Sequence, residues 1–337
     1  TNDLLNMNEL DRALLLADDL PGVGVTGNLD QGQTDGLTNL VLQLADEPLV
    51  TGNASVDNYG STSTGLNRAN ANFIVNSPLR IGDLLNINTM VSQGTRYVRV
   101  EETVPVGYSG LRVGVNASHL QYQLTDAQFS NLGANGLSQT VGLSADFPLI
   151  RSRPKNLNAT FNFDNKFYLN QANGSTTSDY SSRSASFGVN GNVFDEFLGG
   201  GANYASIIWT VGYLDLNGSG NQLSDLITAN TQGNFTKARY SISRQQKLTP
   251  ELSAYANFTG QITQRNLDSS ESFYLGGING IRAYPTSEGR GSQGQLLNLE
   301  LRRQLPNGFN LSGFFDWGRV TTYPNNSFTG SPNPNEF

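Results

Sequence analysis

The sequence predicts a mainly β protein in which a transmembrane antiparallel β-barrel, residues 49–337, follows part of a small α+β domain, residues 1–48. Apolar and polar residues alternate in about 13 segments from residue 49 onward, the pattern of strands with one apolar face. Short and long connections mostly alternate between these segments, as they do in barrels that span an outer membrane. A helical pattern followed by two strand patterns predicts the preceding domain.

The first 48 residues predict one helix and one hairpin. Residues 8–17 place Leu10, Leu14 and Ala17 on one helical face, with Asn8 as the cap. Residues 23–27 and 40–44 predict two strands that pair across a glycine-rich turn. A helix and a hairpin bury too little apolar surface to form a good core alone. The segment therefore predicts the C-terminal part of a larger α+β domain.

The strand pattern of the larger region is clearest in five segments. In residues 297–302, leucine occupies every second position, and polar or charged residues lie between. A water-soluble β-sandwich shows the same alternation, so the alternation alone does not separate the two folds. The other four clear segments are residues 157–164, 184–190, 253–262 and 309–317.

The connections favour the membrane barrel over the sandwich. Outer-membrane barrels have short periplasmic turns and longer outer loops. The link near Gly94 is short where a long one would be due. We expect tight turns at residues 78–82, 107–110, 153–156, 248–250 and 306–308, and long polar loops at 125–136, 170–181, 216–232 and 266–292.

Composition excludes several other classes of protein. No segment approaches the roughly 20 consecutive apolar residues of a membrane-spanning helix. With no cysteine and one histidine, the chain has no disulfide and no cysteine-ligated or histidine-cluster metal site. A net charge of −7 argues against nucleic acid as a partner. Because nucleophile motifs and phosphate-binding loops are also missing, we predict neither an enzyme nor a cofactor.

Two segments near the N-terminus resemble a known family. Residues 10–23, LDRALLLADDLPGV, resemble the second polypeptide-transport-associated (POTRA) domain of two-partner secretion transporters. This is the family of haemolysin and filamentous-haemagglutinin secretion proteins. Residues 55–65, SVDNYGSTSTG, resemble the first barrel strand and loop of the same family.

Three further segments follow in the order that the wider outer-membrane assembly superfamily has. Residues 275–284, LGGINGIRAY, are similar to its loop motif, Val-Arg-Gly-Tyr, although Ala283 replaces the glycine. Residues 298–302, NLELR, and 314–318, FFDWG, resemble the two strands after that loop. The resemblance implies sixteen strands where the alternation predicts about 13, so we expect the chain to lack segments at both ends.

The resemblance implies an outer-membrane translocator that exports a large, unfolded exoprotein from the periplasm without nucleotide hydrolysis. It implies a monomer in the outer membrane of a Gram-negative bacterium, in contact with the lipid bilayer, with its N-terminal domain in the periplasm. An assembly factor of the same superfamily, which inserts other outer-membrane proteins, is the first alternative. A passive porin is the second, and the preceding domain argues against it.

The candidate site is the contact between loop 266–292 and the barrel wall. A turn at residues 306–308 places residues whose numbers sum to about 614 opposite each other, so Glu300 and Asp316 are diagonal neighbours on inward faces. One arginine, with its planar fork, reaches either carboxylate or both. The alternative is an ordinary water-filled pore lining. By resemblance the site includes Arg282, Tyr284, Gly276, Gly277, Glu300, Asp316 and Gly318.

Three basic residues mark a second candidate surface. Lys237, Arg239 and Lys247 lie at alternate positions and therefore share one face of a strand with polar residues. They are candidates for pore lining. A solvated sheet face would show the same pattern.

Overall fold

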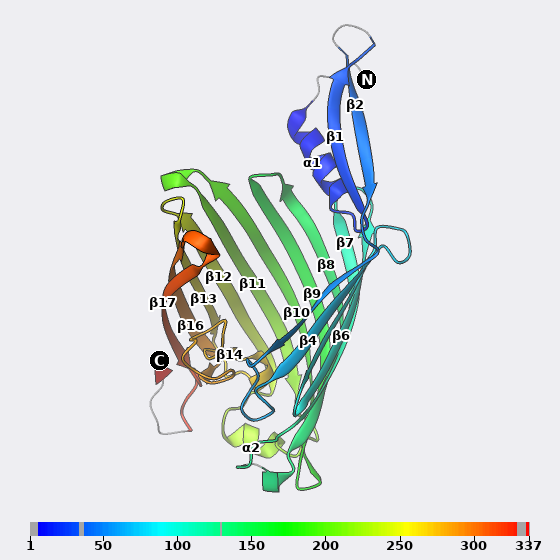
Figure 1. The fold of residues 1–337 in the computed structure, drawn as a ribbon. Helices are drawn as coiled ribbons and strands as arrows, with labels where there is room; N and C mark the ends of the chain where they lie inside the picture. The colour runs from blue at the N-terminus through cyan, green and yellow to red at the C-terminus, as the bar shows by residue number, and fades with distance from the viewer. Residues whose placement is uncertain (1–5, 34–36, 129, 329–334, 337) are drawn as a thin grey trace.

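The computed structural model describes residues 6–33, 37–128, 130–328 and 335–336. A helix and a hairpin stand at one end of a large curved sheet (Figure 1). The predicted mainly β fold is confirmed. Within the described residues, no helix is both long and apolar enough to cross a membrane.

The N-terminal unit consists of α1 (Met7–Asp18) and the antiparallel pair β1 (Val23–Gln31) and β2 (Thr38–Asp46). The helix begins two residues earlier than predicted, because Asn6, and not Asn8, is its cap. The Asn6 side chain accepts the backbone N–H groups of Asn8 and Glu9. In the hairpin, Val25 lies opposite Leu44, and both strands are longer than predicted. Residues 34–36 of the predicted turn lie outside the described residues.

Polar contacts fix α1 to the large sheet. Arg12 donates a 2.7 Å hydrogen bond to the carbonyl of Pro148, and the guanidinium of Arg151 binds Asp19 with two hydrogen bonds of 2.7 and 2.8 Å. Both partners in the sheet lie where a strand approaches a tight turn. The helix is therefore held at the end of the sheet that carries the short turns (Figure 1).

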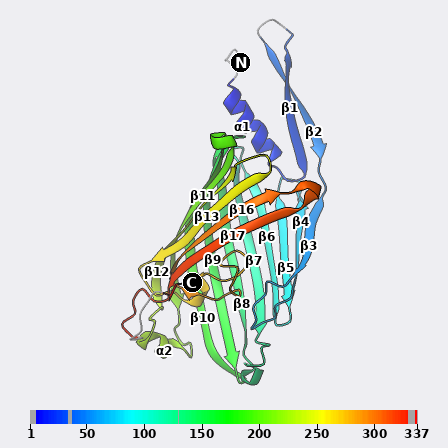
Figure 2. The ribbon, with the colours of Figure 1, turned by 60° about the vertical axis from the view of Figure 1, so that its left-hand side comes forward.

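The large sheet contains fourteen strands, each antiparallel to its neighbours (Figure 2). Thirteen have eight or more residues, which matches the number predicted from alternation. Within the described residues β3 and β18 are the two edges, so the sheet is not closed. The strands are β3 (Val50–Asp57), β4 (Arg68–Asn76), β5 (Leu84–Ser92), β6 (Thr95–Val106), β7 (Leu111–Gln123), β8 (Asn135–Arg151), β9 (Lys155–Ala172), β10 (Ser175–Asp195), β11 (Gly201–Asp215), β12 (Gly233–Lys247), β13 (Leu252–Thr263), β16 (Gln293–Gln304), β17 (Asn310–Thr321) and β18 (Asn335–Glu336).

Two connections differ from the prediction. The predicted loop at 170–181 is wrong, because β9 and β10 continue through it and join at a two-residue turn. Asn173 and Gly174 form that turn with φ of 51° and 73°, the backbone that a tight hairpin requires. The loop at 216–232 contains a six-residue helix, α2 (Gln222–Ile227), which the sequence did not predict.

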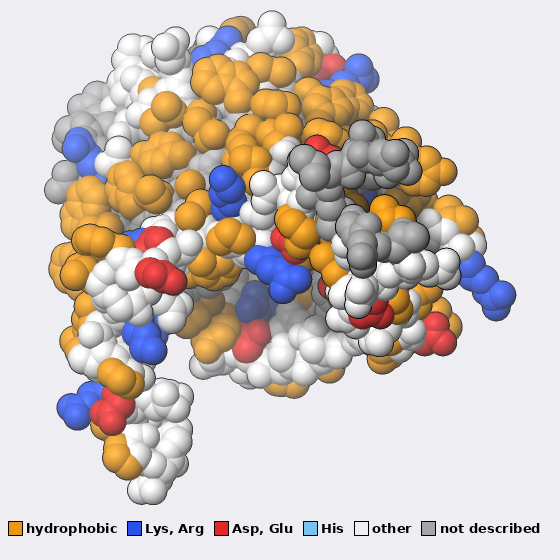
Figure 3. All heavy atoms as spheres, turned by 90° about the horizontal axis from the view of Figure 1, so that it is seen from above, with side chains coloured by type: hydrophobic (Ala, Val, Ile, Leu, Met, Phe, Trp, Pro, Cys, Tyr) orange, Lys and Arg blue, Asp and Glu red, His pale blue; other side chains and the backbone are white. Residues whose placement is uncertain are grey.

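The sheet has apolar residues outside and polar residues inside. In β10, Phe187 is 57% exposed, whereas Ser182 on the opposite face is 1% exposed. The predicted outward direction of the apolar faces is confirmed there and in β9, where Phe161 and Phe163 are exposed. Hydrophobic side chains cover much of the outer surface, and charged side chains gather in the central hollow (Figure 3). This arrangement suits a lipid exterior and a hydrated interior.

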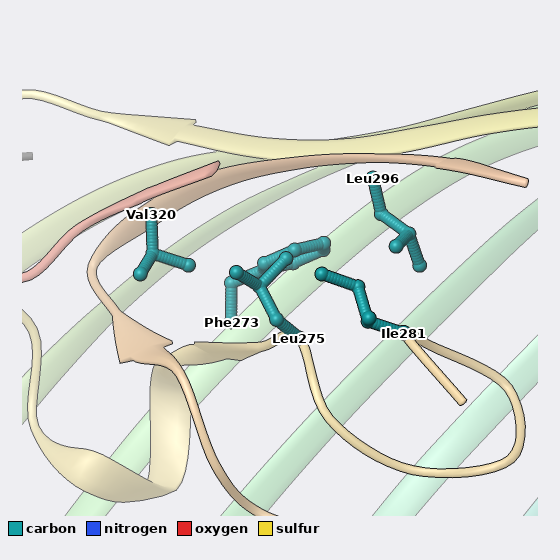
Figure 4. Close-up of a cluster of buried hydrophobic side chains, with 5 residues drawn as sticks. All are labelled: Phe273, Leu275, Ile281, Leu296 and Val320. Atoms are coloured by element: carbon teal, nitrogen blue, oxygen red, sulfur yellow. The ribbon is translucent and has the colours of Figure 1, made fainter. Parts of the chain in front are cut away.

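The main apolar core lies inside the sheet. Loop 266–292 brings Phe273, Leu275 and Ile281 against Leu296 of β16 and Val320 of β17 (Figure 4). Leu296 and Val320 break the rule that inward positions are polar. The loop covers them, so they are buried without contact with lipid.

Candidate functional site

Loop 266–292 folds into the lumen. It begins with a short 3₁₀-helix, η3 (Ser269–Glu271), and continues into β14 (Phe273–Tyr274), which pairs with β15 (Arg290–Gly291). Leu275 is 1% exposed and Ile281 is 4% exposed, both against the inner wall. The loop is therefore a packed element of the interior.

The tip of the loop is a compact turn closed by its own backbone. Gly277 adopts φ of +112°, which favours glycine, and its N–H donates a 3.0 Å hydrogen bond to the carbonyl of Tyr284. The N–H of Gly276 binds the carbonyl of Glu288. Ala283 is not among the described residues with positive φ. Alanine at this position therefore carries no penalty from a positive φ.

Arg282 binds both predicted carboxylates. Its Nε and Nη2 donate hydrogen bonds of 2.9 and 2.6 Å to the two oxygens of Asp316, and its Nη1 donates one of 2.5 Å to Glu300. The backbone N–H of Arg282 also donates to Asp316, at 3.1 Å. These side chains are 5–19% exposed. We call Arg282, Glu300 and Asp316 the Arg282 clasp.

The register between β16 and β17 explains why one arginine reaches both acids. Asn298 lies opposite Asp316, and Glu300 lies opposite Phe314, as the length of the 306–308 turn predicts. The carboxylates are therefore diagonal neighbours on the inner face. The hydrogen bond with Asp316, more than any other contact, raises the pKa of Arg282 above its ordinary value.

Three residues that the sequence analysis did not select complete the clasp. Asn298 donates hydrogen bonds of 2.9 Å to Asp316 and to the carbonyl of Gly280. Arg302 donates a 2.6 Å hydrogen bond to the second oxygen of Glu300. The ring of Phe314 lies 3.8 Å from Cζ of Arg282, within cation–π range. All three share the inward parity of Glu300 and Asp316, and this parity is the signal that would have found them.

Gly318 gives the loop room to approach the wall. A Cβ atom at this position would lie 2.5 Å from Cδ2 of Leu275 and 3.0 Å from Cδ1 of Ile281. A side chain at this position would therefore displace the ends of Leu275 and Ile281 from the wall.

A second set of contacts holds the base of the loop. The Glu271 carboxylate accepts hydrogen bonds or ion pairs from Lys166 of β9 at 2.8 Å and Lys237 of β12 at 2.6 Å. Arg239 binds the carbonyl of Ser272 at 3.0 Å. Two of the three predicted pore-lining cations, Lys237 and Arg239, thus contact the loop. Lys247 lies ten residues after Lys237 on β12, opposite Ser253.

The charge state of Glu271 follows from its surroundings. Burial acts to raise its pKa, but the ammonium groups of Lys237 and Lys166 outweigh burial, so the pKa lies below the ordinary glutamate value. Glu271 is therefore a carboxylate near neutral pH. The described residues contain no group of three or more His, Cys, Asp or Glu side chains with the geometry of a metal site.

A curved antiparallel sheet with an apolar exterior, a polar interior and a loop held within it has the construction of an outer-membrane β-barrel wall. Comparison with known families identifies the class further. The chain belongs to the haemolysin secretion/activation protein family ShlB/FhaC/HecB, the two-partner secretion family, whose profile matches residues 36–330.

Curated relatives agree with this assignment. The chain is 25% identical over 335 residues to the heme/hemopexin transporter protein HuxB of Haemophilus influenzae. The matched region covers 97% of this chain and 59% of the relative. It is 21% identical over 313 residues to the outer membrane transporter CdiB of Dickeya dadantii, covering 90% of this chain and 54% of the relative. The chain thus spans less than two thirds of these relatives.

Solved structures support the fold. CdiB from Escherichia coli superposes with a TM-score of 0.79 at 22% identity, covering 97% of this chain and 62% of that one. BamA from Haemophilus ducreyi gives a TM-score of 0.56 at 14% identity, covering 92% of this chain and 65% of that one.

Proposed function

We propose that this protein is the outer-membrane transporter of a two-partner secretion system and exports a large partner exoprotein through its barrel. The observation that carries the proposal is the Arg282 clasp, which holds a long loop inside a polar lumen. Family membership supports the same function. The barrel would lie in the outer membrane of a Gram-negative bacterium, as a monomer.

In this proposal the clasp controls access to the lumen. The loop fills part of the interior at rest, so an exported chain can pass only after the loop moves. Charge-assisted hydrogen bonds hold it in place, yet they exchange readily for hydrogen bonds with water or with a passing polypeptide. Folding of the partner outside the cell would supply the driving force, and nucleotide hydrolysis has no role.

Residues 1–48 would be the C-terminal part of a periplasmic POTRA domain that recognises the unfolded partner. All nine residues of β2 are exposed, and β2 has a neighbour only in β1 among the described residues. An exposed strand edge can accept a strand of another polypeptide. The anchoring of α1 by Arg12 and Arg151 would keep this recognition unit at the entrance of the barrel.

The second candidate function is assembly of other outer-membrane proteins. The structural likeness to BamA favours it, and the family match to secretion proteins favours export. The two functions differ in one observable. Loss of an assembly factor lowers the amount of many outer-membrane proteins, whereas loss of an exporter removes one large protein from the medium.

The test of export is substitution of Arg282 in the full-length protein, coexpressed with its partner exoprotein. Arg282→Ala leaves Asp316 without a cation and Glu300 with Arg302 alone. We therefore expect strongly reduced secretion from a barrel that is still inserted. Arg282→Lys should restore secretion only in part, because an ammonium group cannot reproduce the two-pronged contact with Asp316.

The matched control is Arg303→Ala, which removes an exposed arginine of β16, the strand that carries Glu300. Secreted exoprotein is measured by immunoblot of the medium. Barrel folding is measured by the heat-dependent shift of the protein on gels. Wild-type secretion by folded Arg282→Ala protein would refute the role of the clasp.

A further inference from the structure

The inner wall contains a second binding arrangement, which the export proposal does not use. Five hydrogen bonds or ion pairs run from wall side chains to two consecutive loop residues, Glu271 and Ser272. The carboxylate of Glu271 binds Lys166 and Lys237, at 2.8 and 2.6 Å. The main-chain carbonyl of Glu271 accepts hydrogen bonds from Lys237 at 2.9 Å and from Gln261 at 3.0 Å. The main-chain carbonyl of Ser272 accepts one from Arg239.

These contacts have the composition of a peptide-binding site. Three of the five go to main-chain carbonyls, which every polypeptide presents, and two go to one carboxylate. The donors come from β9, β12 and β13 and are held in place by the sheet. Gln261 is fully buried, and its side-chain oxygen accepts a 2.5 Å hydrogen bond from Arg239, which orients both donors. The site is therefore preorganised on a rigid wall.

The wall carries more positive charge than the loop neutralises. Lys166, Lys237 and Arg239 bring three positive charges. Glu271 and Asp164, which lies two residues before Lys166 on the same face of β9, bring two negative ones, so the sum is +1 (3 − 2). Without Glu271 the sum becomes +2 (3 − 1). Nearby Arg99 and Glu101 neutralise each other through a 3.3 Å ion pair. Departure of the loop would thus uncover a cationic site.

We propose that Lys166, Lys237, Arg239 and Gln261 form a binding site for an acidic residue in an extended segment of the translocating polypeptide, and that Glu271 and Ser272 occupy this site when the loop is inside. The inference rests on the proposed export function. The wall would bind the main-chain carbonyls of any unfolded chain. It would prefer segments with aspartate or glutamate, because their carboxylates add an ion pair. We call these six residues the Glu271 cluster.

The experiment uses the full-length protein in planar lipid bilayers and two synthetic unfolded peptides of equal length. One carries glutamate at every third position, and the other carries glutamine there. In Glu271→Gln channels we expect the acidic peptide to block the ionic current at a concentration at least about tenfold lower than the neutral peptide. The wild type should show a smaller preference, because Glu271 competes for the site.

Substitutions of the wall then test which residues create the preference. Lys166→Gln or Lys237→Gln, each added to Glu271→Gln, should reduce the preference. Lys247→Gln should leave it unchanged, because this cation of the same strand lies ten residues away. If the buried Lys237 variant does not fold, Arg239→Gln serves instead, because Arg239 is exposed to the lumen. Folding of each variant is checked by the heat-dependent gel shift.

Equal block by both peptides in folded Glu271→Gln channels would overturn the proposal. A preference that survives the combined Lys166→Gln and Lys237→Gln substitutions would also overturn it. Because peptide block needs no exoprotein, this result is independent of the secretion assay. If the protein secretes no exoprotein but is still blocked preferentially by the acidic peptide, the export function is refuted and the proposed binding site is supported.

Discussion

Arg282 shows how few residues hold the loop at its tip. Its side chain and backbone donate four hydrogen bonds to two carboxylates, and Asn298 and Arg302 occupy the remaining carboxylate positions. Charged hydrogen bonds of this kind contribute about 1.5–3 kcal/mol each when well shielded from water. The contacts are strong enough to hold the loop at rest, and all of them are polar and exchangeable.

Gly318 allows a direct test of loop packing that leaves every charge in place. Gly318→Val would bring new side-chain atoms into the space of Leu275 and Ile281, at a cost of about 1–3 kcal/mol by overpacking. We expect the loop to become more susceptible to proteolysis while the barrel stays folded. The measurement is limited trypsin digestion of the inserted protein, with cleavage sites located by mass spectrometry.

Gly313→Val is the matched control, since a Cβ atom at this position of the same strand has no neighbour within 4 Å. Its loop should be digested at the wild-type rate. If Gly318→Val also leaves the rate unchanged, the packing of Leu275 and Ile281 does not hold the loop.

For individual residues, the sequence is sufficient to predict contacts between neighbouring strands, but not contacts between distant segments. The position of Glu300 relative to Asp316 depends on one short turn, so counting residues was sufficient. The Glu271 cluster depends on the path of a 27-residue loop and on the curvature that brings β9 near β12. Neither is encoded in a spacing. Leu296 broke the inward polar pattern, because only the folded loop makes its position apolar.

Among the elements, β9 and β10 explain the principal error in the predicted connections. Residues 170–181, where β9 ends and β10 begins, are rich in serine, threonine and asparagine, a composition that predicts a loop. The structure continues both strands through it. A strand that extends beyond the lipid contacts water on both faces, so it loses the apolar face by which strands are recognised. The same reasoning explains why the number of strands was easier to predict than their lengths.

The position of α1 depends on a few polar contacts with the ends of strands. Arg151 and Asp19 form a two-pronged ion pair, but both are partly exposed, so it contributes at most about 1 kcal/mol. Arg151→Ala should therefore leave the helix folded and broaden its range of positions. The measurement is the distribution of distances between spin labels on α1 and on the turn after β8.

Arg153→Ala is the control for this prediction. Arg153 binds Asp11 of the same helix at 3.1 Å but is 78% exposed, so its loss should have little effect on the distribution. If Arg151→Ala gives the same narrow distribution as the wild type, the ion pair does not position the helix. The contact of Arg12 with Pro148 would then be the principal anchor.

Across the whole molecule, the loop connects parts of the sheet that are far apart in sequence. Its base contacts β9, β12 and β13, its tip binds β16 and β17, and Thr286 donates a 2.9 Å hydrogen bond to the carbonyl of Tyr59, just after β3. The loop thus touches wall segments near both edges of the described sheet. Movement of the loop would therefore change the lumen along several strands at once.

The N-terminal unit and the large sheet are structurally separate, so we expect the barrel to fold without the unit. The unit has its own two-stranded sheet, and polar contacts from α1 link it to the strand ends. The apolar exterior of the large sheet does not depend on it. Deletion of the proposed periplasmic region, up to residue 48 of this sequence, should therefore leave the barrel inserted in the membrane and abolish secretion of the exoprotein.

Secretion and insertion are measured separately, the first in the medium and the second by the heat-dependent gel shift of the membrane fraction. Asp46→Asn, at the end of β2, is a control that preserves the unit. Loss of both secretion and insertion would mean that the unit is needed for barrel assembly. Secretion at the normal level from the shortened protein would show that the partner is recognised by the barrel itself, and the lumen wall around Lys166 and Lys237 would be the first place to look for that recognition.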